Sequence, residues 1–439
     1  MRPVTNYAIL QRNEKGYATA YFSGKLPSMQ ENDELLCRVI RESDNMTVIP
    51  WTKCVLQGDE WSVLLDVPEG GLYRFETKVA NGTSKTLEWV ARTCIVRHFG
   101  VGDLYLLTGQ SNMAGYGRDA AYDPPCLGVH LYGNNGSWDI AAHPLNDSTD
   151  TIYPENAEYC TETSPALSFA RKLHQSLGIP IGLIQASLGG SPLSAWDPSD
   201  NGTLYRAMMR RIEVVGNVKG VLWYQGCSDA GAGLAESYLA RFKNMVSLWR
   251  KDLGYVPFLT VQLNRWSVQN EESDRYWGIV RDAQRRAAVE IDGVYVVPAI
   301  DCAQNDGIHN NSASNVVIGE RLADVALCKI YGKVGMTAPN ILSAEYVDEQ
   351  TILIKFDNAY IRAIDENAYG LNIEDAEGLA DCVRAFVCDD GIQITCSRKF
   401  SLPAKFHALW RCHPPAYVPR DAFGMPMLSC YGVEITEKK

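Results

Sequence analysis

One serine of this chain has the surroundings of a nucleophile. Ser111 lies in the segment 109–113, of sequence GQSNM, directly after an apolar run at residues 103–108. A serine where a buried strand turns into a helix lies at the edge of an α/β sheet that carries the chemistry of such folds. The helix start that follows offers free backbone N–H groups to an oxyanion. The α/β-hydrolase elbow needs a glycine where this chain has Met113, so two interpretations stay open, a nucleophile or a helix-capping serine.

A serine nucleophile needs a base, and one of the seven histidines has a carboxylate within reach. Asp306 and His309 lie between an apolar run at 294–298 and a segment at 314–330 with helical spacing of apolar residues. An aspartate three residues before a histidine can fold back and accept its Nδ1 hydrogen, which leaves Nε2 free to take the serine proton. An Asx turn that opens a helix is the alternative.

Two further strand-like runs end in groups that a tetrahedral intermediate could use. Gly190 follows the run at 181–186 and can bring its backbone N–H close to a substrate. Gln225 follows the run at 221–224 and could donate its side-chain amide. Each segment alone is more often a plain turn. Four strand ends with a nucleophile, an N–H donor, an amide donor and an Asp-His pair indicate an acyl-transfer site.

The chain resembles the SGNH hydrolases, and within them the branch of carbohydrate esterases that contains sialate O-acetylesterases and acetylxylan esterases. The matching motifs are GQSNM at 109–113, GGSP at 189–192 with Trp196, WYQG at 223–226, and Asp306-x-x-His309. The resemblance covers residues 100–332, with a weaker likeness at 9–12 to the start of a β-domain. As a set these motifs are specific.

The resemblance implies a serine esterase that removes O-acetyl groups from a carbohydrate, either a sialic acid or a plant polysaccharide or oligosaccharide. By position, Ser111 would be the nucleophile, His309 the base and Asp306 the carboxylate that orients it. The N–H groups of Ser111 and Gly190 and the side chain of Gln225 would bind the oxyanion. No cofactor is implied.

Cys227 departs from the family pattern, in which a glutamate usually follows the Tyr-Gln-Gly triplet. A thiol cannot replace a carboxylate in a salt bridge, because free cysteine titrates near pH 8.5. We interpret Cys227 as a small buried apolar residue rather than a second nucleophile. Two alternatives to the acetylesterase stay open: a lipid or thioester acyl hydrolase, and a catalytically weak glycan-binding protein.

Three side chains near the motifs could bind a sugar. Arg118 could pair with a substrate carboxylate such as that of sialic acid, although a surface salt bridge is the more common use of such a residue. Trp196 and Tyr224 could stack on a sugar ring or belong to the core. The segment 115–163 is polar, has little periodicity and is too long for a plain connector, so we expect it to form a wall of the substrate cleft.

Composition limits the partners. The net charge of −11 disfavours nucleic acid and anionic membranes, because both require basic surface. The thirteen cysteines form no Cys-x-x-Cys pairs, and no histidine cluster has zinc spacing, so no metal is expected. Residues 1–6 lack the apolar stretch of a signal peptide, so the expected location is the cytoplasm. The oligomeric state is not indicated.

The pattern of elements predicts three domains in the 439 residues. Residues 1–98 alternate apolar and polar residues, with a predicted hairpin of 61–67 and 73–79 in a β-sandwich. Residues 99–335 alternate strands and helices, which predicts a flavodoxin-like αβα sandwich with a five-stranded parallel sheet, the expected catalytic domain. Residues 336–439 return to short strands. The predicted fold is therefore an α/β domain flanked by β-sandwich domains.

Overall fold

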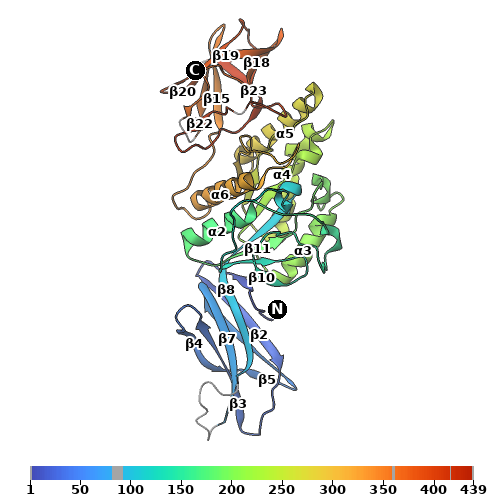
Figure 1. Ribbon diagram of the computed structural model, residues 1–439, viewed down its shortest axis with the longest axis vertical. Coiled ribbons are helices and arrows are strands. Elements are labelled where there is room, and N and C mark those ends of the chain that lie inside the picture. Colours follow the sequence, from blue (N-terminus) through green and yellow to red (C-terminus); the bar gives the residue numbers. More distant parts are fainter. Residues whose placement is uncertain (1, 82–91, 358–360, 416, 438–439) are drawn as a thin grey trace.

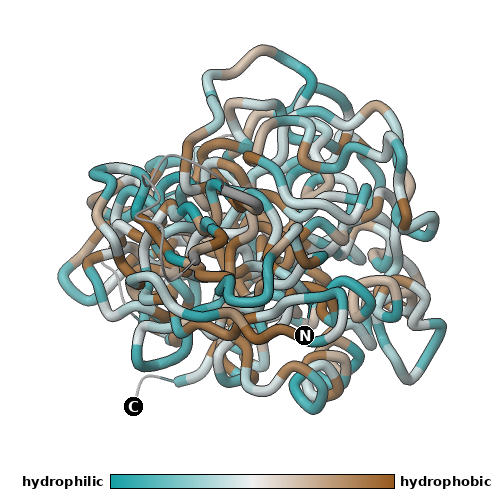
Figure 2. The backbone as a smooth tube through the Cα atoms, turned by 90° about the horizontal axis from the view of Figure 1, so that it is seen from below, coloured by the Kyte–Doolittle hydropathy of each residue, from teal (hydrophilic) through white to brown (hydrophobic). Residues whose placement is uncertain are grey.

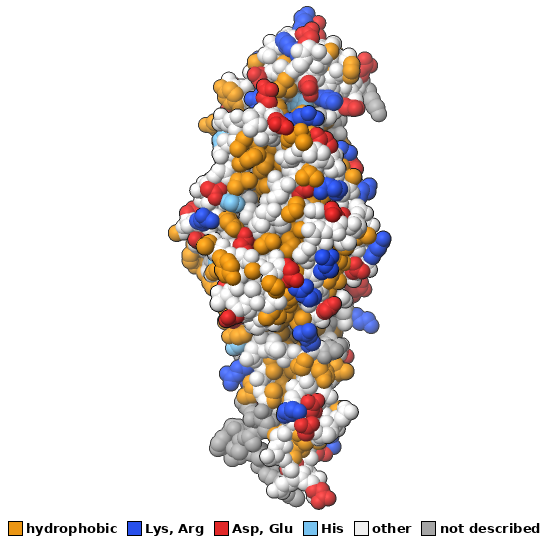
Figure 3. Space-filling view, turned by 90° about the vertical axis from the view of Figure 1, so that its right-hand side faces the viewer, with side chains coloured by type: hydrophobic (Ala, Val, Ile, Leu, Met, Phe, Trp, Pro, Cys, Tyr) orange, Lys and Arg blue, Asp and Glu red, His pale blue; other side chains and the backbone are white. Residues whose placement is uncertain are grey.

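The computed structural model describes residues 2–81, 92–357, 361–415 and 417–437. The molecule is elongated, with an α/β domain between an N-terminal β-domain at one end and a C-terminal β-domain at the other (Figure 1). Each part has a separate hydrophobic core. Hydrophobic stretches gather toward the inside of the tube view (Figure 2), and basic and acidic side chains are interspersed on the face shown in Figure 3. Within the described residues, no helix combines the length and the apolar character that crossing a membrane requires.

The N-terminal domain is a sandwich of two sheets. Phe22 of one sheet stacks on Phe75 of the other, with ring centroids 3.8 Å apart, and Trp61 packs beside them. The predicted hairpin is wrong, because the two runs belong to different sheets. The run at 61–67 pairs with Tyr17–Lys25 and Val55–Gln57, whereas the run at 73–79 pairs with Asp33–Arg41 and Arg92–Gly109. The strands are β1 (Ile9–Gln11), β2 (Tyr17–Lys25), β3 (Asp33–Arg41), β4 (Thr47–Lys53), β5 (Val55–Gln57), β6 (Glu60–Pro68) and β7 (Gly70–Asn81).

One long strand, β8 (Arg92–Gly109), connects the sandwich to the α/β domain. Its first half pairs with β7 up to Val101, and its second half pairs with the central parallel sheet from Asp103 onward. The predicted boundary at residue 98 therefore falls inside a continuous strand. Because β8 points away from the sandwich, the sandwich lies at the amino edge of the parallel sheet, and Ser111 lies at the carboxyl edge.

The central sheet has the order β10-β9-β11-β8-β12-β13-β14. The five predicted strands are all present and follow the order of a flavodoxin-like sheet. The predicted count of five is short, because β9 adds a sixth parallel strand and β10 an antiparallel edge. Both come from the segment 115–163, where their few residues gave too little periodicity to recognise. The strands are β9 (Val129–Tyr132), β10 (Trp138–Ile140), β11 (Ile181–Gln185), β12 (Gly220–Tyr224), β13 (Phe258–Val261) and β14 (Val294–Val297).

Helices cover both faces of this sheet, as a three-layer sandwich requires. Tyr105 packs on Phe169 of α2, whereas Trp223 of the neighbouring strand points to the opposite face and packs on Phe242 and Trp249 of α4. Gly178 ends α2 in the left-handed conformation, which glycine adopts without steric cost. The helices are α1 (Ser111–Ala114), α2 (Ala166–Leu177), α3 (Thr203–Val215), α4 (Leu234–Leu253), α5 (Glu271–Glu290) and α6 (Ser312–Lys329).

The C-terminal domain is a closed barrel and not the expected sandwich. Arg281 of α5 attaches it to the α/β domain, because its buried guanidinium donates to the carbonyls of Leu409 and Arg411 on one side and of Leu263 on the other. The barrel strands are β15 (Ile341–Asp348), β16 (Thr351–Phe356), β18 (Leu371–Asp375), β19 (Gly378–Cys388), β20 (Gly391–Cys396), β21 (Ala404–Ala408) and β23 (Cys430–Glu437), with the separate pair β17 (Ile361–Ala363) and β22 (Arg420–Asp421).

Candidate active site

Ser111 lies at the carboxyl end of β8, where the backbone of β8 closely approaches that of β12. Gly109 has φ of +112°, and a Cβ atom there would lie 2.3 Å from the carbonyl oxygen of Tyr224. Only glycine fits this position. The Gly109 carbonyl accepts a hydrogen bond of 3.0 Å from the N–H of Leu188, which ties the loop after β11 to this strand end. Ser111 then begins α1, between the ends of β11 and β12.

The structure brings Ser111, His309 and Asp306 together in a hydrogen-bonded chain. Ser111 Oγ lies 2.9 Å from Nε2 of His309, and Nδ1 of His309 lies 2.7 Å from Oδ2 of Asp306. The other carboxylate oxygen of Asp306 accepts the N–H groups of Ile308 and His309 at 2.8 and 2.7 Å. Partial burial raises the pKa of Asp306, but these hydrogen bonds and the adjacent ring lower it more, so the pKa lies below its ordinary value.

Asparagine side chains fix the loop that carries His309. Asn112 Oδ1, next to the serine, accepts the N–H of Asn310 at 3.0 Å. Asn264, after β13, donates to the carbonyl of Ile308 and to Asn310 Oδ1, both at 2.8 Å. The sequence motif contains Asn112 without indicating this role, and Asn264 was not predicted as a site residue. The pattern that could have identified Asn264 is a polar residue directly after a predicted strand, as in the sequence QLN at 262–264.

A tyrosine and a glutamate from the segment 115–163 connect His309 to the loop after β11. The Tyr116 ring stacks on the His309 imidazole with centroids 4.5 Å apart, and its hydroxyl donates to Glu158 at 2.7 Å. Glu158 also accepts the Gly189 N–H and the Asn146 amide, both at 3.0 Å. Burial and the adjacent Glu158 carboxylate raise the pKa of Tyr116 to about 12. The two ends of this segment thus lie beside His309 and the loop after β11, while its middle forms β9 and β10.

Ser111 and Gly190, two of the predicted oxyanion donors, belong to segments that meet at the Gly109 carbonyl. Ser111 is the first residue of α1, so its N–H precedes the hydrogen-bonded turns of the helix. Gly190 has φ of +66°, is exposed, and faces open space where a side chain would project. The Ser228 hydroxyl donates to the Gly190 carbonyl at 3.0 Å and thereby fixes this peptide.

Gln225 is placed differently from the prediction. Its side chain is fully buried, and Nε2 donates to the Ser191 carbonyl at 3.2 Å and to Asp229 Oδ2 at 2.6 Å. Its Oε1 accepts the Tyr238 hydroxyl at 3.0 Å. Both amide hydrogens are therefore used within the protein, and the amide is not free to bind an oxyanion. Gln225 instead joins the loops after β11 and β12.

Asp229 supplies a buried carboxylate two residues after Cys227. Besides Gln225, it accepts the Leu193 N–H at 2.8 Å and pairs with Arg241 at 2.8 Å. The Cys227 N–H donates to Gln110 Oε1 at 3.1 Å, and burial raises the pKa of the Cys227 thiol to about 12. This shift favours the protonated thiol at neutral pH, but the side chain is half-buried and not the fully buried residue that the sequence analysis expected.

The three predicted sugar-binding side chains differ in their exposure to solvent. Trp196 and Tyr224 are fully buried and cannot stack on a sugar, because Trp196 packs against Trp223 and the Tyr224 hydroxyl accepts the Asn310 amide at 3.1 Å. Arg118 is exposed beside the site, with its guanidinium 5.3 Å from the centre of the Tyr116 ring. Within the described ranges, no cluster of three or more His, Cys, Asp or Glu side chains could hold a metal ion.

Residues 101–328 match the family of carbohydrate esterases described as sialic acid-specific acetylesterases. This chain belongs to that family. The predicted resemblance is confirmed, and the protein is a carbohydrate acetylesterase. A probable carbohydrate esterase from Arabidopsis thaliana is 27% identical over 248 residues, which cover 51% of this chain and 90% of that protein. The sialate O-acetylesterase of Homo sapiens is 24% identical over 353 residues, 68% of this chain and 66% of the human protein.

A solved structure shares the whole architecture. The crystal structure of a carbohydrate acetylesterase from Xanthomonas citri has a TM-score of 0.68 to this chain at 21% identity, and the match covers 97% of both chains. The β-domains on either side of the α/β domain are therefore part of a fold that another protein also has.

Proposed function

We propose that the protein is a serine esterase that releases acetate from an O-acetylated carbohydrate through an acyl-enzyme on Ser111. The observation that carries the proposal is the hydrogen-bonded chain from Ser111 Oγ to His309 at 2.9 Å and from His309 to Asp306 at 2.7 Å. This order of hydroxyl, imidazole and carboxylate activates a serine for attack on an ester.

In the first half of the reaction, Ser111 Oγ attacks the acetyl carbonyl carbon while Nε2 of His309 takes the hydroxyl proton. The negative charge on the carbonyl oxygen is stabilised by the N–H groups of Ser111 and Gly190. The bond to the sugar oxygen then breaks, and His309 gives its proton to the departing hydroxyl. Asp306 accepts the Nδ1 hydrogen throughout and stabilises the imidazolium form.

In the second half, water replaces the serine hydroxyl. His309 takes a proton from water as the water oxygen attacks the acetylated Ser111, and acetate leaves as Oγ recovers the proton. The stacked Tyr116 ring holds the plane of the imidazole during both proton transfers. No other group has to accept or supply an electron or a proton.

The sugar that fits best carries a carboxylate, as a sialic acid does. Arg118 lies against Tyr116, whose other neighbour is His309, so its charge is positioned at the rim of the site. The human relative is named a sialate O-acetylesterase. Acetate release from O-acetylated sialic acids should therefore exceed release from acetylated xylan, which is neutral.

The first prediction is that Ser111→Ala abolishes acetate release while the protein stays folded, because the hydroxyl is the group that becomes acylated. Hydrolysis of an aryl acetate and a melting curve measure both effects, with Ser247→Ala on the exposed surface of α4 as the control. Mass spectrometry after acid quenching should find acetyl on Ser111. Retention of more than a few per cent of activity, or preference for an aryl octanoate, would contradict the proposal.

A further inference from the structure

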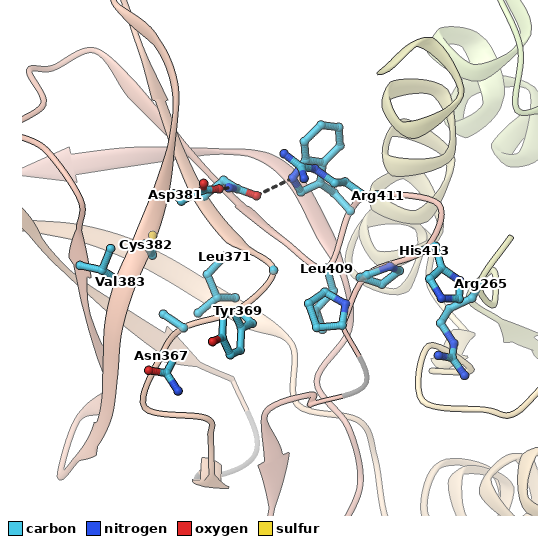
Figure 4. Close-up of a pocket in the computed structure, with 16 residues that line it drawn as sticks. Arg265, Asn367, Tyr369, Leu371, Asp381, Cys382, Val383, Leu409, Arg411 and His413 are labelled. Carbon is cyan, nitrogen blue, oxygen red and sulfur yellow. Dashed lines mark hydrogen bonds between the residues drawn. The ribbon is translucent and has the colours of Figure 1, made fainter. Parts of the chain in front are cut away.

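A second cavity of about 770 Å³ lies between the barrel and the chain segment that follows β21. In Figure 4 the barrel residues Asn367, Tyr369 and Val383 lie on one side, and Leu409, Arg411, His413 and Arg265 on the other. Ser111, His309 and Asp306 do not line it. The cavity is therefore distinct from the candidate active site and is large enough for a sugar residue.

The cavity has aromatic walls whose positions are enforced by the backbone. Tyr369 lines the cavity with 55% of its surface exposed, and it follows Ala368, which has φ of +53°. Trp410 follows Leu409, which has φ of +54°. Residues other than glycine rarely adopt such angles, and they do so where the surrounding structure requires a particular direction of the chain.

Hydrogen bonds fix the Trp410 ring in its wall. Its Nε1 donates to Asn372 Oδ1 at 2.9 Å, and the Asn372 amide donates to Asp381 at 2.7 Å (Figure 4). The ring therefore cannot turn away when the cavity is empty. The Trp410 ring itself is buried and serves as part of the wall, whereas the exposed Tyr369 phenol offers a face on which the apolar side of a pyranose can pack.

The charged side chains of the cavity favour an anion. Arg265 and Arg411 both line it, and within the part of the chain that the structure describes neither forms an ion pair. Arg265 donates to the Cys302 carbonyl at 2.7 Å, but its Nε is buried without a hydrogen-bond partner among the described residues. Asp381 is the lining carboxylate, and it already accepts the Asn372 amide. Two guanidinium groups thus face one carboxylate in a chain whose net charge is −11.

The cavity is connected to the loop of His309 through one short segment. The Arg265 carbonyl accepts the Gln304 amide at 2.7 Å, and the Ser267 N–H donates to the Gly307 carbonyl at 2.8 Å. Between them, the Trp266 N–H donates to the Cys412 carbonyl at 2.8 Å. The segment 265–267 therefore borders the barrel cavity on one side and the Asp306–His309 loop on the other.

We infer that this cavity binds a carboxylate-bearing sugar residue of the glycan whose acetyl group is removed at Ser111. The exposed Tyr369 ring would pack on the sugar, and the guanidinium groups that line the cavity would attract its carboxylate. The inference rests on the proposed function for the nature of the glycan. It assigns the barrel a part in substrate binding.

The test measures binding without turnover, so that its result does not depend on acetate release. Ser111→Ala is titrated calorimetrically with trigalacturonic acid and with neutral xylotriose. We expect trigalacturonic acid to bind at least tenfold more tightly than xylotriose. Adding Tyr369→Ala should weaken binding of the acid tenfold or more, and adding Arg411→Ala should remove most of the preference for the acid over the neutral sugar.

The matched controls are Phe423→Ala and Arg384→Ala, an exposed ring and an exposed guanidinium of the C-terminal domain that do not line the cavity. Both should leave the affinities unchanged, and melting curves should show that all variants are folded. Equal affinity for the two sugars, or unchanged binding in the Tyr369→Ala variant, would overturn the inference. Absence of acetate release by the wild-type protein would instead overturn the proposed function, so the two failures are distinct.

Discussion

The loops after β12 and β14 each bring a carboxylate to the carboxyl edge of the sheet, and they use it differently. Asp306, after β14, has a side chain 39% exposed and binds one imidazole and the N–H groups of its own turn. Asp229, after β12, has a side chain only 1% exposed and binds Gln225, Leu193 and Arg241. The first carboxylate binds the imidazole of the proposed base, and the second joins separate segments of the chain.

The partners of Asp306 lie in its own loop, whereas the partners of Asp229 come from several segments of the chain. The Asp306 loop is local, because its donor and acceptor groups lie within four residues and need only a tight turn. The Asp229 cluster is assembled from the ends of β11 and β12 and from α4. Loss of Asp306 should therefore affect the reaction and leave the fold intact, whereas loss of Asp229 should affect both.

The largest effect expected in this comparison is that of Asp306→Asn. The amide can still occupy the turn, but it cannot stabilise the positive charge that forms on His309, and it can select the wrong tautomer of the ring. We expect kcat to fall on the order of a thousandfold, with a melting temperature close to that of the wild type. A loss of less than about tenfold would show that another group orients His309.

Asp229→Asn should have a smaller effect on activity and a larger one on stability. The amide nitrogen would face either the Gln225 amide and the Leu193 N–H or the Arg241 guanidinium, all of which are donors, and the negative charge that pairs with Arg241 would be lost. Breaking a buried pair in this way costs about 3 kcal/mol. Urea denaturation should show that loss, and aryl acetate hydrolysis should fall roughly tenfold to a hundredfold as the Gly190 loop shifts. Unchanged stability would remove the structural role assigned to Asp229.

Glu158→Ala tests whether the two loops are also connected through the segment 115–163. The change removes the acceptor of both the Tyr116 hydroxyl and the Gly189 N–H, so the imidazole and the oxyanion loop lose a common support. We expect kcat to fall roughly tenfold, the value of a lost charge-assisted hydrogen bond, with little change in KM. Glu158→Gln should recover most of the rate, and Tyr116→Phe should lose only the part carried by the hydroxyl. A change in KM alone would instead place Glu158 in substrate binding.

Much of this site was predictable because parallel strands end at one edge. Ser111 and His309 are far apart in the chain, yet each follows a strand of the same sheet, so an apolar run followed by a polar residue located both. The Asp306 and His309 pair was predictable because three residues separate them. Gln225 was assigned wrongly because its partners, Asp229 and Tyr238, lie on a short helix and on α4, and no local pattern indicates which donor a buried amide will meet.

The wrong predictions about burial, strand pairing and the barrel also arose because contacts between distant segments leave no local pattern in the sequence. Trp196 and Tyr224 lie beside motifs, but burial depends on the helices that pack over them and not on their neighbours in the chain. The runs at 61–67 and 73–79 alternate apolar and polar residues, as strands do. This pattern indicates which face of a strand is buried, but it does not indicate which other strand pairs with it. The barrel was not distinguished from a sandwich for the same reason, since both are built from short alternating strands.

The smallest effect expected is that of Cys227→Ser. The family's glutamate is missing here, and the geometry shows a carboxylate two residues further on, where Asp229 holds Gln225. Burial raises the pKa of the half-buried thiol to about 12, which disfavours the thiolate at neutral pH, and we therefore assign it no chemical step. A hydroxyl of similar size should keep the rate within about threefold and the stability within about 1 kcal/mol. If Cys227→Ser lost activity, or if acetyl were found on Cys227 in the wild-type protein, the thiol would take part in the reaction.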